Sequence, residues 1–223
     1  MQSHTKVILI RHGQTEWNDG ARFQGHLDSR LTQLGIRQAE ALGQRLAQEK
    51  ITAIYSSDLG RAIHTAEIIA RSTNHKVTTD PRLRERCLGV FQGLQRDEAQ
   101  QQYPVEFKKY FSRDPEYAVP GGESVRAHFS TCFACLDELA ARHPGQTIAI
   151  VTHGGALQAL FRHIVGIPFD AIRRFSIQNA AYNLLASGPD GWSVITWGDI
   201  AHLTKVMADD SKTASITYSQ TVE

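Results

Sequence analysis

Three features of the sequence predict an α/β fold with three layers, in which helices cover both faces of a mostly parallel central sheet. Residues 7–10 and 147–152 are apolar runs of the length typical of fully buried strands, and such strands occur inside parallel sheets. Segments with apolar residues at helical spacing follow both runs. Strands and helices therefore alternate along the chain, which is the order expected of an α/β fold.

The elements of the first half follow from capping residues and apolar spacing. A helix is predicted from Thr32, its N-cap, with apolar residues at helical spacing as far as Leu46. A strand is predicted over residues 53–56, and Asp58 is then expected to cap the next helix. A short strand over residues 76–79 completes this half.

The second half begins with a polar segment. Residues 92–120 contain several tyrosines and little periodicity, and we interpret them as a partly helical insertion packed over the rest of the molecule. A long helix is predicted over residues 124–142, and another helix follows the apolar strand at 147–152. Two late strands, over residues 182–186 and 193–197, flank a Gly-Pro-Asp-Gly turn.

These elements predict one α/β domain over residues 1–208, with residues 94–120 as a small insertion that caps the site. Residues 209–223 are polar and lack periodicity, so a disordered tail is expected there.

Composition excludes several classes of protein. The 223 residues are 41% hydrophobic and 21% charged, which is ordinary for a globular chain. A net charge of +1 gives no overall field that would favour nucleic acid or an anionic membrane. No apolar stretch approaches the ~20 residues that span a bilayer, and the first residues lack a secretory apolar region. The expectation is a cytoplasmic protein without nucleic-acid or membrane partners.

The chain has three cysteines, an odd and sparse number that favours a reducing compartment. Cys132 and Cys135 form a C-x-x-C pair inside an amphipathic segment. No second pair of ligands accompanies them, so we interpret them as core residues of a helix rather than as a zinc or redox site.

Charged side chains follow the predicted strands at the point where each strand ends. Arg11 and His12 end the first strand, His153 ends the strand at 147–152, and Arg61 comes a turn after a third strand. Ligands of open α/β sheets bind beyond the carboxyl ends of the strands, and arginine forks match phosphate oxygens. The glycine after each histidine is expected to let the backbone turn sharply and a ligand come close.

An anion site, most simply for a phosphoryl group, is therefore predicted, although neither a GxGxxG nor a P-loop fingerprint is present. Simpler interpretations stay open at this point. A single strand-end histidine is more often structural than catalytic, and Arg61 alone would be a solvated helix residue.

The segment R-H-G-Q-T-E-W-N at residues 11–18 resembles the R-H-G-E/Q-T-x-W-N signature of the histidine phosphatase superfamily, in its phosphoglycerate-mutase-like branch. The resemblance extends in the family's order over most of the chain, excluding the first few residues and those after about Met207. It is carried by F-Q-G at 23–25, L-T-Q-L-G at 31–35, S-S-D-L-G-R-A-I-H-T-A at 56–66, L-R-E at 83–85, G-G-E-S at 121–124, H-G-G at 153–155 and D-I-A-H-L at 199–203.

This resemblance implies a metal-independent phosphomonoesterase that acts through a phosphohistidine intermediate. His12 would be the nucleophile, and a neutral imidazole can attack phosphorus near neutral pH. Arg11, Arg61 and His153 would neutralise the phosphoryl oxygens. Because these cationic groups carry the charge, neither a metal nor a cofactor is expected.

Glu85 resembles the family's proton donor to the leaving oxygen. Considered without the family, it would simply pair with Arg84 or Arg86. Substrate binding is expected from Asn18, Thr15, Gln24, Gly25 and Gly154.

A cofactor-dependent phosphoglycerate mutase is the alternative activity, because L-R-E-R-C-L-G-V-F-Q-G-L at residues 83–94 partly resembles those enzymes. Three departures favour a phosphatase. His153 is followed by Gly-Gly where mutases usually have Gly-Asn, the insertion is short and lacks their arginine pair, and W-G-D-I-A-H-L is typical of phosphatases. An inactive phosphate-binding module is a third hypothesis, disfavoured because every catalytic position that can be mapped is filled.

The expected partner is a small phosphorylated metabolite, and the sequence leaves open whether the protein is a monomer or a homodimer. Basic and aromatic residues of the insertion would favour an acidic substrate if they line the entrance, or would form a solvated helix face: Lys108, Lys109, Tyr110 and Arg113.

Overall fold

The computed structural model describes residues 4–206, and the expected tail from residue 209 lies outside them. The sheet of this part of the chain has six strands in the order β3-β2-β4-β1-β5-β6. The first four are parallel, whereas β5 and β6 run antiparallel to their neighbours, as predicted for a mostly parallel sheet. The strands are Thr5–Arg11 (β1), Ile51–Ser56 (β2), Val77–Thr79 (β3), Thr147–Thr152 (β4), Tyr182–Gly188 (β5) and Gly191–Asp199 (β6).

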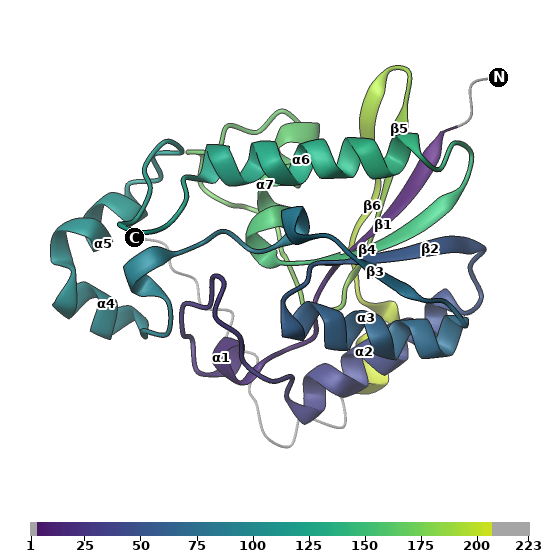
Figure 1. Ribbon diagram of the computed structural model, residues 1–223, viewed down its shortest axis with the longest axis horizontal. Coiled ribbons are helices and arrows are strands. Elements are labelled where there is room, and N and C mark those ends of the chain that lie inside the picture. Colours follow the sequence, from purple (N-terminus) through teal and green to yellow (C-terminus); the bar gives the residue numbers. More distant parts are fainter. Residues whose placement is uncertain (1–3, 207–223) are drawn as a thin grey trace.

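Helices cover both faces of the sheet, which confirms the three-layer prediction (Figure 1). Helices α2 (Gln33–Leu46) and α3 (Gly60–Thr73) lie on one face, and α6 (Val125–Ala141) and α7 (Gly154–Ile164) lie on the other. The shorter helices are α1 (Glu16–Asp19), η1 (Pro81–Leu83), η2 (Gly89–Phe91), α4 (Arg96–Gln102), α5 (Pro104–Phe111) and η3 (Ala201–Leu203).

The continuous apolar run of β1 is explained by burial on both faces. Ile8 and Ile10 pack into a cluster with α2 and α3, whereas Val7 and Leu9 pack into a second cluster with α6 and α7. All four side chains are 0% exposed. Alternation of polar and apolar residues is absent because neither face of this strand meets water.

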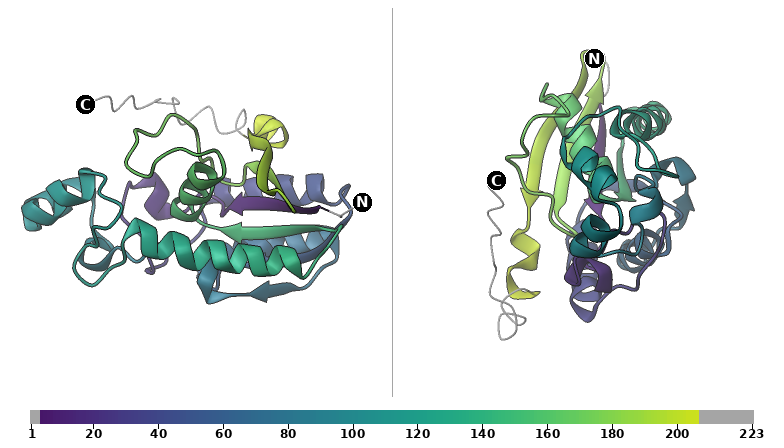
Figure 2. Two further views of the ribbon diagram at one scale, coloured as in Figure 1. Left: turned by 90° about the horizontal axis from the view of Figure 1, so that it is seen from above. Right: turned by 90° about the vertical axis from the view of Figure 1, so that its left-hand side faces the viewer.

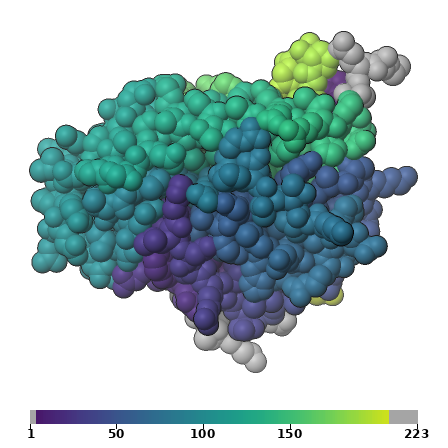
Figure 3. All heavy atoms as spheres, viewed as in Figure 1, coloured from purple at the N-terminus to yellow at the C-terminus, as the bar shows by residue number. Residues whose placement is uncertain are grey.

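The insertion forms a cap at one end of the molecule, as expected. Helices α4 and α5 stand away from the sheet, beyond the carboxyl ends of its parallel strands (Figures 1 and 2). They enclose a small apolar cluster of their own, centred on Phe91 and Phe107. Phe23 reaches this cluster from the N-terminal segment, and Figure 3 shows the cap in contact with that segment at the surface.

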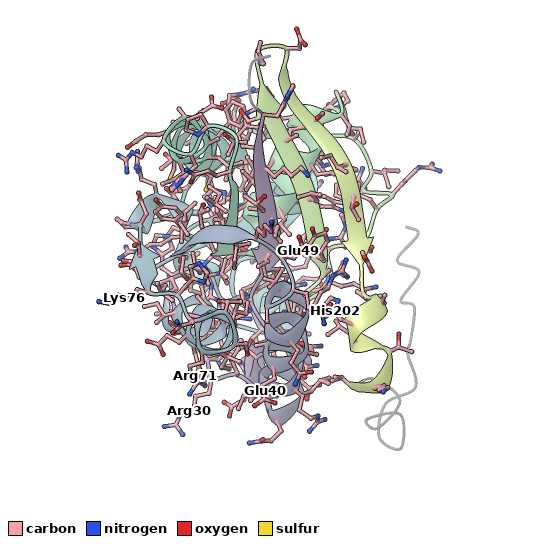
Figure 4. The ribbon with its side chains drawn as sticks, turned by 90° about the vertical axis from the view of Figure 1, so that its right-hand side faces the viewer. Arg30, Glu40, Glu49, Arg71, Lys76 and His202 are labelled. Carbon is pink, nitrogen blue, oxygen red and sulfur yellow. The ribbon has the colours of Figure 1, made fainter. Side chains whose placement is uncertain are left out.

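At the opposite end, charged side chains such as Arg71 and Lys76 extend from the surface (Figure 4). His202, labelled in the same view, donates from Nε2 to the carbonyl of Ala180, which fixes η3 beside the end of the sheet. The buried side chains of His12, Arg61 and His153 lie instead where the parallel strands end under the cap.

The expectation that Asp58 caps α3 is wrong. The N-cap position is Leu59, and Asp58 instead accepts two hydrogen bonds from Arg84, at 2.6 and 2.5 Å. These bonds also lower the pKa of Asp58. A bidentate, charge-assisted pair is stronger than a single bond to a backbone N–H, so the carboxylate turns to Arg84. Asp28 takes over the capping and accepts from the backbone N–H groups of Gly60 and Arg61.

The interpretation of the C-x-x-C pair as helix core is confirmed. Cys132 and Cys135 lie on α6 with exposures of 1% and 0%, and neither forms a disulfide. Burial raises the pKa of both thiols, that of Cys135 to about 12, so they stay protonated. Within residues 4–206, no group of three or more histidine, cysteine or acidic side chains is placed to hold a metal ion. No helix in that range is long and apolar enough to cross a membrane.

Candidate active site

The two strand-end histidines lie side by side because β1 and β4 are parallel neighbours. Arg11 pairs with Thr152 in the register of these strands, so His12 and His153 follow at the same edge of the sheet. The centroids of their rings are 5.2 Å apart. Two residues 141 positions apart in the sequence thus form one site, as the strand-end pattern predicts.

The ring of His12 is held in one tautomer. Its Nδ1 lies 2.8 Å from the carbonyl oxygen of Gly13, and a carbonyl only accepts, so Nδ1 carries the proton. In the neutral ring, Nε2 therefore keeps its lone pair. Burial lowers the pKa of His12 well below 6.5, and the charges of Arg11 and Arg61 lower it further. His12 is a neutral imidazole with a free Nε2 at neutral pH.

The backbone on either side of His12 is also fixed. Asn179 donates from Nδ2 to the carbonyl of His12 at 2.7 Å, and Thr65 accepts from the N–H of Gly13 at 3.0 Å. A Cβ at residue 13 would come within 2.4 Å of the carbonyl oxygen of Gly35. The glycine after His12 thus admits the start of α2 rather than a ligand, which corrects the expectation.

Arg61 is a buried part of the site and not a solvated helix residue. It is 2% exposed, and its guanidinium donates to the carbonyls of Leu27 and Gly25 and to the carboxylate of Asp28. Its Nε has no partner among residues 4–206. Gly25 adopts φ +57°, and a side chain there would strike Gln92, so glycine is required where this carbonyl turns toward Arg61.

Arg11 lies at the same cavity and is held by the loop before β5. One terminal nitrogen donates to the carbonyl of Ile177 at 2.8 Å, while Nε is buried and lacks a partner in the described part of the chain. Burial lowers the pKa of Arg11 to about 10, and Glu85 partly opposes this. Arg11 therefore remains charged at neutral pH.

His153 is completely buried behind the cavity wall. Its Nε2 is 2.8 Å from Oγ of Ser57, and its Nδ1 has no partner within residues 4–206. Burial lowers the pKa of His153 well below 6.5, followed by the charges of Arg61 and of His12 when that ring is protonated. Both rings are therefore neutral at neutral pH.

Glu85 faces the site and does not pair with its neighbouring arginines. Its two carboxylate oxygens accept backbone N–H groups, one from Gly155 at the start of α7 and one from Arg86, both at 2.9 Å. A Cβ at residue 155 would come within 2.2 Å of this carboxylate, so only glycine permits the contact. Arg84, the other candidate partner, is bound to Asp58.

A cavity of about 460 Å³ opens between the sheet edge and the cap. Its walls include eight of the ten residues that the sequence singled out: Arg11, His12, Asn18, Gln24, Gly25, Arg61, Glu85 and Gly154. The exceptions are His153 and Thr15. Of the insertion residues considered for the entrance, Tyr110 and Arg113 line the cavity, whereas Lys108 and Lys109 are exposed elsewhere.

Thr15 is buried and organises residues that do reach the cavity. Its hydroxyl accepts from the N–H of Asn18 at 3.1 Å and from Nε2 of Gln24 at 2.9 Å. Asn18 in turn accepts on Oδ1 from the N–H of Thr15, which closes a capping box at α1. Oε1 of Gln24 is buried without a partner in the described residues.

Three supporting residues were not identified from the sequence. Ser57 contacts His153, Asp28 contacts Arg61, and Asn179 holds the backbone of His12. Ser57 had a usable signal, since it directly follows β2 beside the ends of the other parallel strands. Asp28 and Asn179 lie in loops, and nothing in their local sequence indicates the distant groups that they bind.

His12, Arg11, Arg61 and Glu85 thus line one cavity, and His153 is buried behind its wall. The chain belongs to the histidine phosphatase superfamily, branch 1, whose family model matches residues 7–200.

Named relatives of this chain fall on both sides of the phosphatase–mutase division. It is 38% identical over 205 residues to the phosphoglycerate mutase-like protein 4 of Arabidopsis thaliana, covering 90% of this chain and 87% of the relative. It is 35% identical to a metal-independent phosphoserine phosphatase of the same plant, covering 91% and 84%. Among solved structures, YhfR of Bacillus stearothermophilus has a TM-score of 0.84 at 33% identity, covering 89% of this chain and 99% of that one.

Proposed function

We propose that this protein is a phosphatase that hydrolyses small phosphomonoesters without a metal, through a phosphohistidine formed on Nε2 of His12. The observation that carries the proposal is the hydrogen bond from Nδ1 of His12 to Gly13 in a buried ring of lowered pKa. Together they present an unprotonated Nε2 to the cavity. The metal-independent phosphatase among the relatives supports the same activity.

In the first step Nε2 attacks phosphorus and the bond from phosphorus to the ester oxygen breaks. The electron pair of that bond goes to the leaving alcohol, which takes a proton from Glu85. In the second step water attacks phosphorus and loses a proton to Glu85, while the bond from phosphorus to Nε2 breaks and its electron pair returns to Nε2. Inorganic phosphate and neutral His12 are released. Splitting the hydrolysis in this way divides one difficult displacement into two easier ones.

Arg11 and Arg61 supply the positive charge for both steps. Hydrogen bonds to backbone carbonyls orient both guanidinium groups before substrate arrives, and neither Nε has a partner within residues 4–206. Charge on the phosphoryl oxygens is then stabilised without reorganisation of water. A bound phosphate dianion also favours protonation of His153, which gives a further cation at the transition state.

Glu85 is placed for proton transfer by the two backbone N–H groups that hold its carboxylate at the cavity wall. We assign substrate contacts to Asn18, Gln24 and Gly154, which line the cavity, and a positioning role to Thr15. The same proposal includes a cytoplasmic location, supported by the unpaired thiols of the described cysteines.

Turnover of p-nitrophenyl phosphate in the presence of EDTA tests the activity. We expect release of inorganic phosphate, and no turnover under these conditions would overturn the proposal. The mutase is the second candidate, favoured by the name of one relative. It is separated by incubation with 3-phosphoglycerate, with and without 2,3-bisphosphoglycerate. A phosphatase releases phosphate in both cases, whereas a mutase forms 2-phosphoglycerate and depends on the bisphosphate.

A further inference from the structure

The cavity extends well beyond the two histidines, and its far side is built from three separate elements. Arg113 comes from the loop after α5, Arg162 from the last turn of α7, and Arg173 from the loop between α7 and β5. All three line the same cavity as His12.

Of the four other arginines that line the cavity, two are ion-paired, whereas Arg11 and Arg86 have no ion pair within residues 4–206. Arg22 is paired with Glu98 and Arg61 with Asp28, at 3.0 and 2.9 Å. Neither Arg113 nor Arg173 forms an ion pair with any residue in the range 4–206. Unpaired guanidinium groups in a cavity wall are ready donors for an anion.

Two acidic side chains lie near this group and do not neutralise it. Asp114 lines the cavity, but its Oδ1 accepts from the backbone N–H of Glu116. Asp170 is near enough to oppose the lowering of the pKa of Arg162, without forming an ion pair.

Arg162 is the buried base of the group. It is 2% exposed, and its terminal nitrogens donate to the carbonyls of Pro168 and Ala171, at 2.6 and 2.7 Å. These bonds tie the loop that carries Arg173 to α7. Its Nε is buried and has no partner within the described range, and guanidinium donors remain after the two bonds are made.

The charges of the three arginines act on one another. Burial lowers the pKa of Arg162, and Arg173 and Arg113 lower it further. Arg173 also lowers the pKa of Arg11, so its charge acts on the phosphoryl end of the same cavity. Like charges held this close are relieved when an anion binds among them.

We propose that Arg113, Arg162 and Arg173 form a second anion subsite, which binds a carboxylate or a second phosphate at the non-reacting end of the substrate. The preferred substrate is then a small phosphomonoester with two anionic groups. This inference rests on the proposed phosphatase function and adds the substrate class.

The test compares substrates that differ only in the second anion. In the first pair, 3-phosphoglycerate has a carboxylate where glycerol 3-phosphate has a hydroxymethyl group. In the second pair, 3-phosphonopropyl phosphate carries an unhydrolysable phosphonate that propyl phosphate lacks. In at least one pair, we expect kcat/KM for the substrate with the second anionic group to exceed that of its control about tenfold or more. Charge-assisted hydrogen bonds reach this size. The pair with the larger ratio identifies a carboxylate or a phosphate as the natural group.

Arg173→Gln is the main variant, because Arg173 is exposed and its removal leaves the core intact. We expect it to lower the preference for the second anionic group about tenfold, by raising KM for the substrates that carry this group. Arg113→Asn is the second variant, chosen because residue 113 has φ 67° and asparagine tolerates this conformation. The matched control is Arg174→Gln, an exposed arginine that lies against a different, apolar pocket and should keep the preference.

Turnover of p-nitrophenyl phosphate distinguishes failure of the proposed phosphatase function from failure of the subsite proposal. Without turnover of that compound by the wild-type protein, the proposed function itself fails. If p-nitrophenyl phosphate is turned over but kcat/KM is equal for substrates with and without the second anionic group, the subsite proposal is wrong and the phosphatase function is retained. Equal loss of preference in Arg173→Gln and Arg174→Gln would also overturn the subsite.

Discussion

The two ends of the cavity hold their positive charges in opposite ways. At the carboxyl ends of the strands, His12 and Arg61 are 3% and 2% exposed, and their side chains bond to backbone carbonyls and, for Arg61, to the carboxylate of Asp28. At the far end, Arg113 and Arg173 are exposed and carry no ion pair within residues 4–206. The buried end suits charge that develops in a transition state, whereas the exposed end suits recognition of a group that does not react.

Burial of Arg61 is tolerated because both of its terminal nitrogens are hydrogen-bonded. Two carbonyls and the carboxylate of Asp28 accept from its terminal nitrogens, which offsets the loss of hydration. Arg173 needs no such arrangement, since water still reaches it. Substitutions at the buried end should therefore affect kcat, and substitutions at the exposed end should affect KM for particular substrates.

The largest effect is expected at the nucleophile. His12→Ala removes Nε2, and kcat for p-nitrophenyl phosphate should fall by about 10⁴-fold or more, as for other covalent nucleophiles. Rapid quenching of the wild-type protein should trap an alkali-stable, acid-labile phosphate that the variant lacks. Arg174→Gln, prepared in parallel, should retain both turnover and label. Substantial turnover by His12→Ala would exclude the phosphohistidine mechanism.

The arginines of the buried end should act as a unit. Arg61→Lys keeps the charge but loses the fork, and we expect a loss of kcat of about 10²- to 10³-fold. Combination with Arg11→Lys should cost less than the product of the two single effects. Vanadate should raise the melting temperature of the wild-type protein, and this shift should shrink in both variants.

Arg173→Gln provides the contrast for this experiment. If Arg61→Lys and Arg173→Gln combine additively, the two ends are independent, as separate sites are expected to be. Strong coupling between them would show instead that the cavity works as one undivided anion site.

Glu85 tests the chemistry of the leaving group. Glu85→Gln keeps the size of the side chain and removes the proton, so hydrolysis of an alkyl phosphate such as 3-phosphoglycerate should slow about 10²-fold. Hydrolysis of p-nitrophenyl phosphate, whose leaving group departs as a stable anion, should change far less. Arg84→Gln, which breaks the pair with Asp58, should affect both substrates alike. Equal loss of kcat/KM on both substrates in Glu85→Gln would make Glu85 a binding residue. The comparison uses kcat/KM because kcat also includes the hydrolysis of the phosphohistidine, in which Glu85 acts for both substrates.

The parts of this site that could be predicted from the sequence are those in which position along a strand determines position in space. The apolar runs of β1 and β4 placed His12 and His153 at one edge because parallel strands share their carboxyl end. The same runs predicted the sheet, since strands buried on both faces lack polar alternation.

The remaining parts depend on partners that are distant in sequence. Aspartate is a preferred residue type at a helix N-cap, which is why Asp58 was expected to cap α3. Only the fold shows that Arg84 binds the Asp58 carboxylate and that Asp28 caps the helix in its place. Asn179 holds the carbonyl of His12 from a loop without any motif. Local patterns contain no information on such pairings, because each requires two segments to be brought together by tertiary packing.

The smallest expected effect concerns the pH dependence of stability, and it follows from the burial of both rings. The pKa values of His12 and His153 are lowered in the folded protein, first of all by burial, and burial also lowers that of His202. The unfolded chain therefore binds more protons than the folded one as pH falls below about 6.5. The free energy of unfolding should decrease on acidification, with a slope of up to about 1.4 kcal/mol per pH unit for each such histidine.

Urea denaturation between pH 7.5 and 5 measures this slope. His153→Asn removes one buried ring and should make the slope shallower, whatever its effect on stability at pH 7.5. The matched control is His64→Gln, which changes an exposed histidine of α3 and leaves the buried rings in place. A stability that is constant or rises on acidification in the wild-type protein would contradict neutral rings in the empty site. Saturating vanadate should flatten the slope, because an anion at the buried end stabilises protonated His153 and so lets the folded protein bind the same protons.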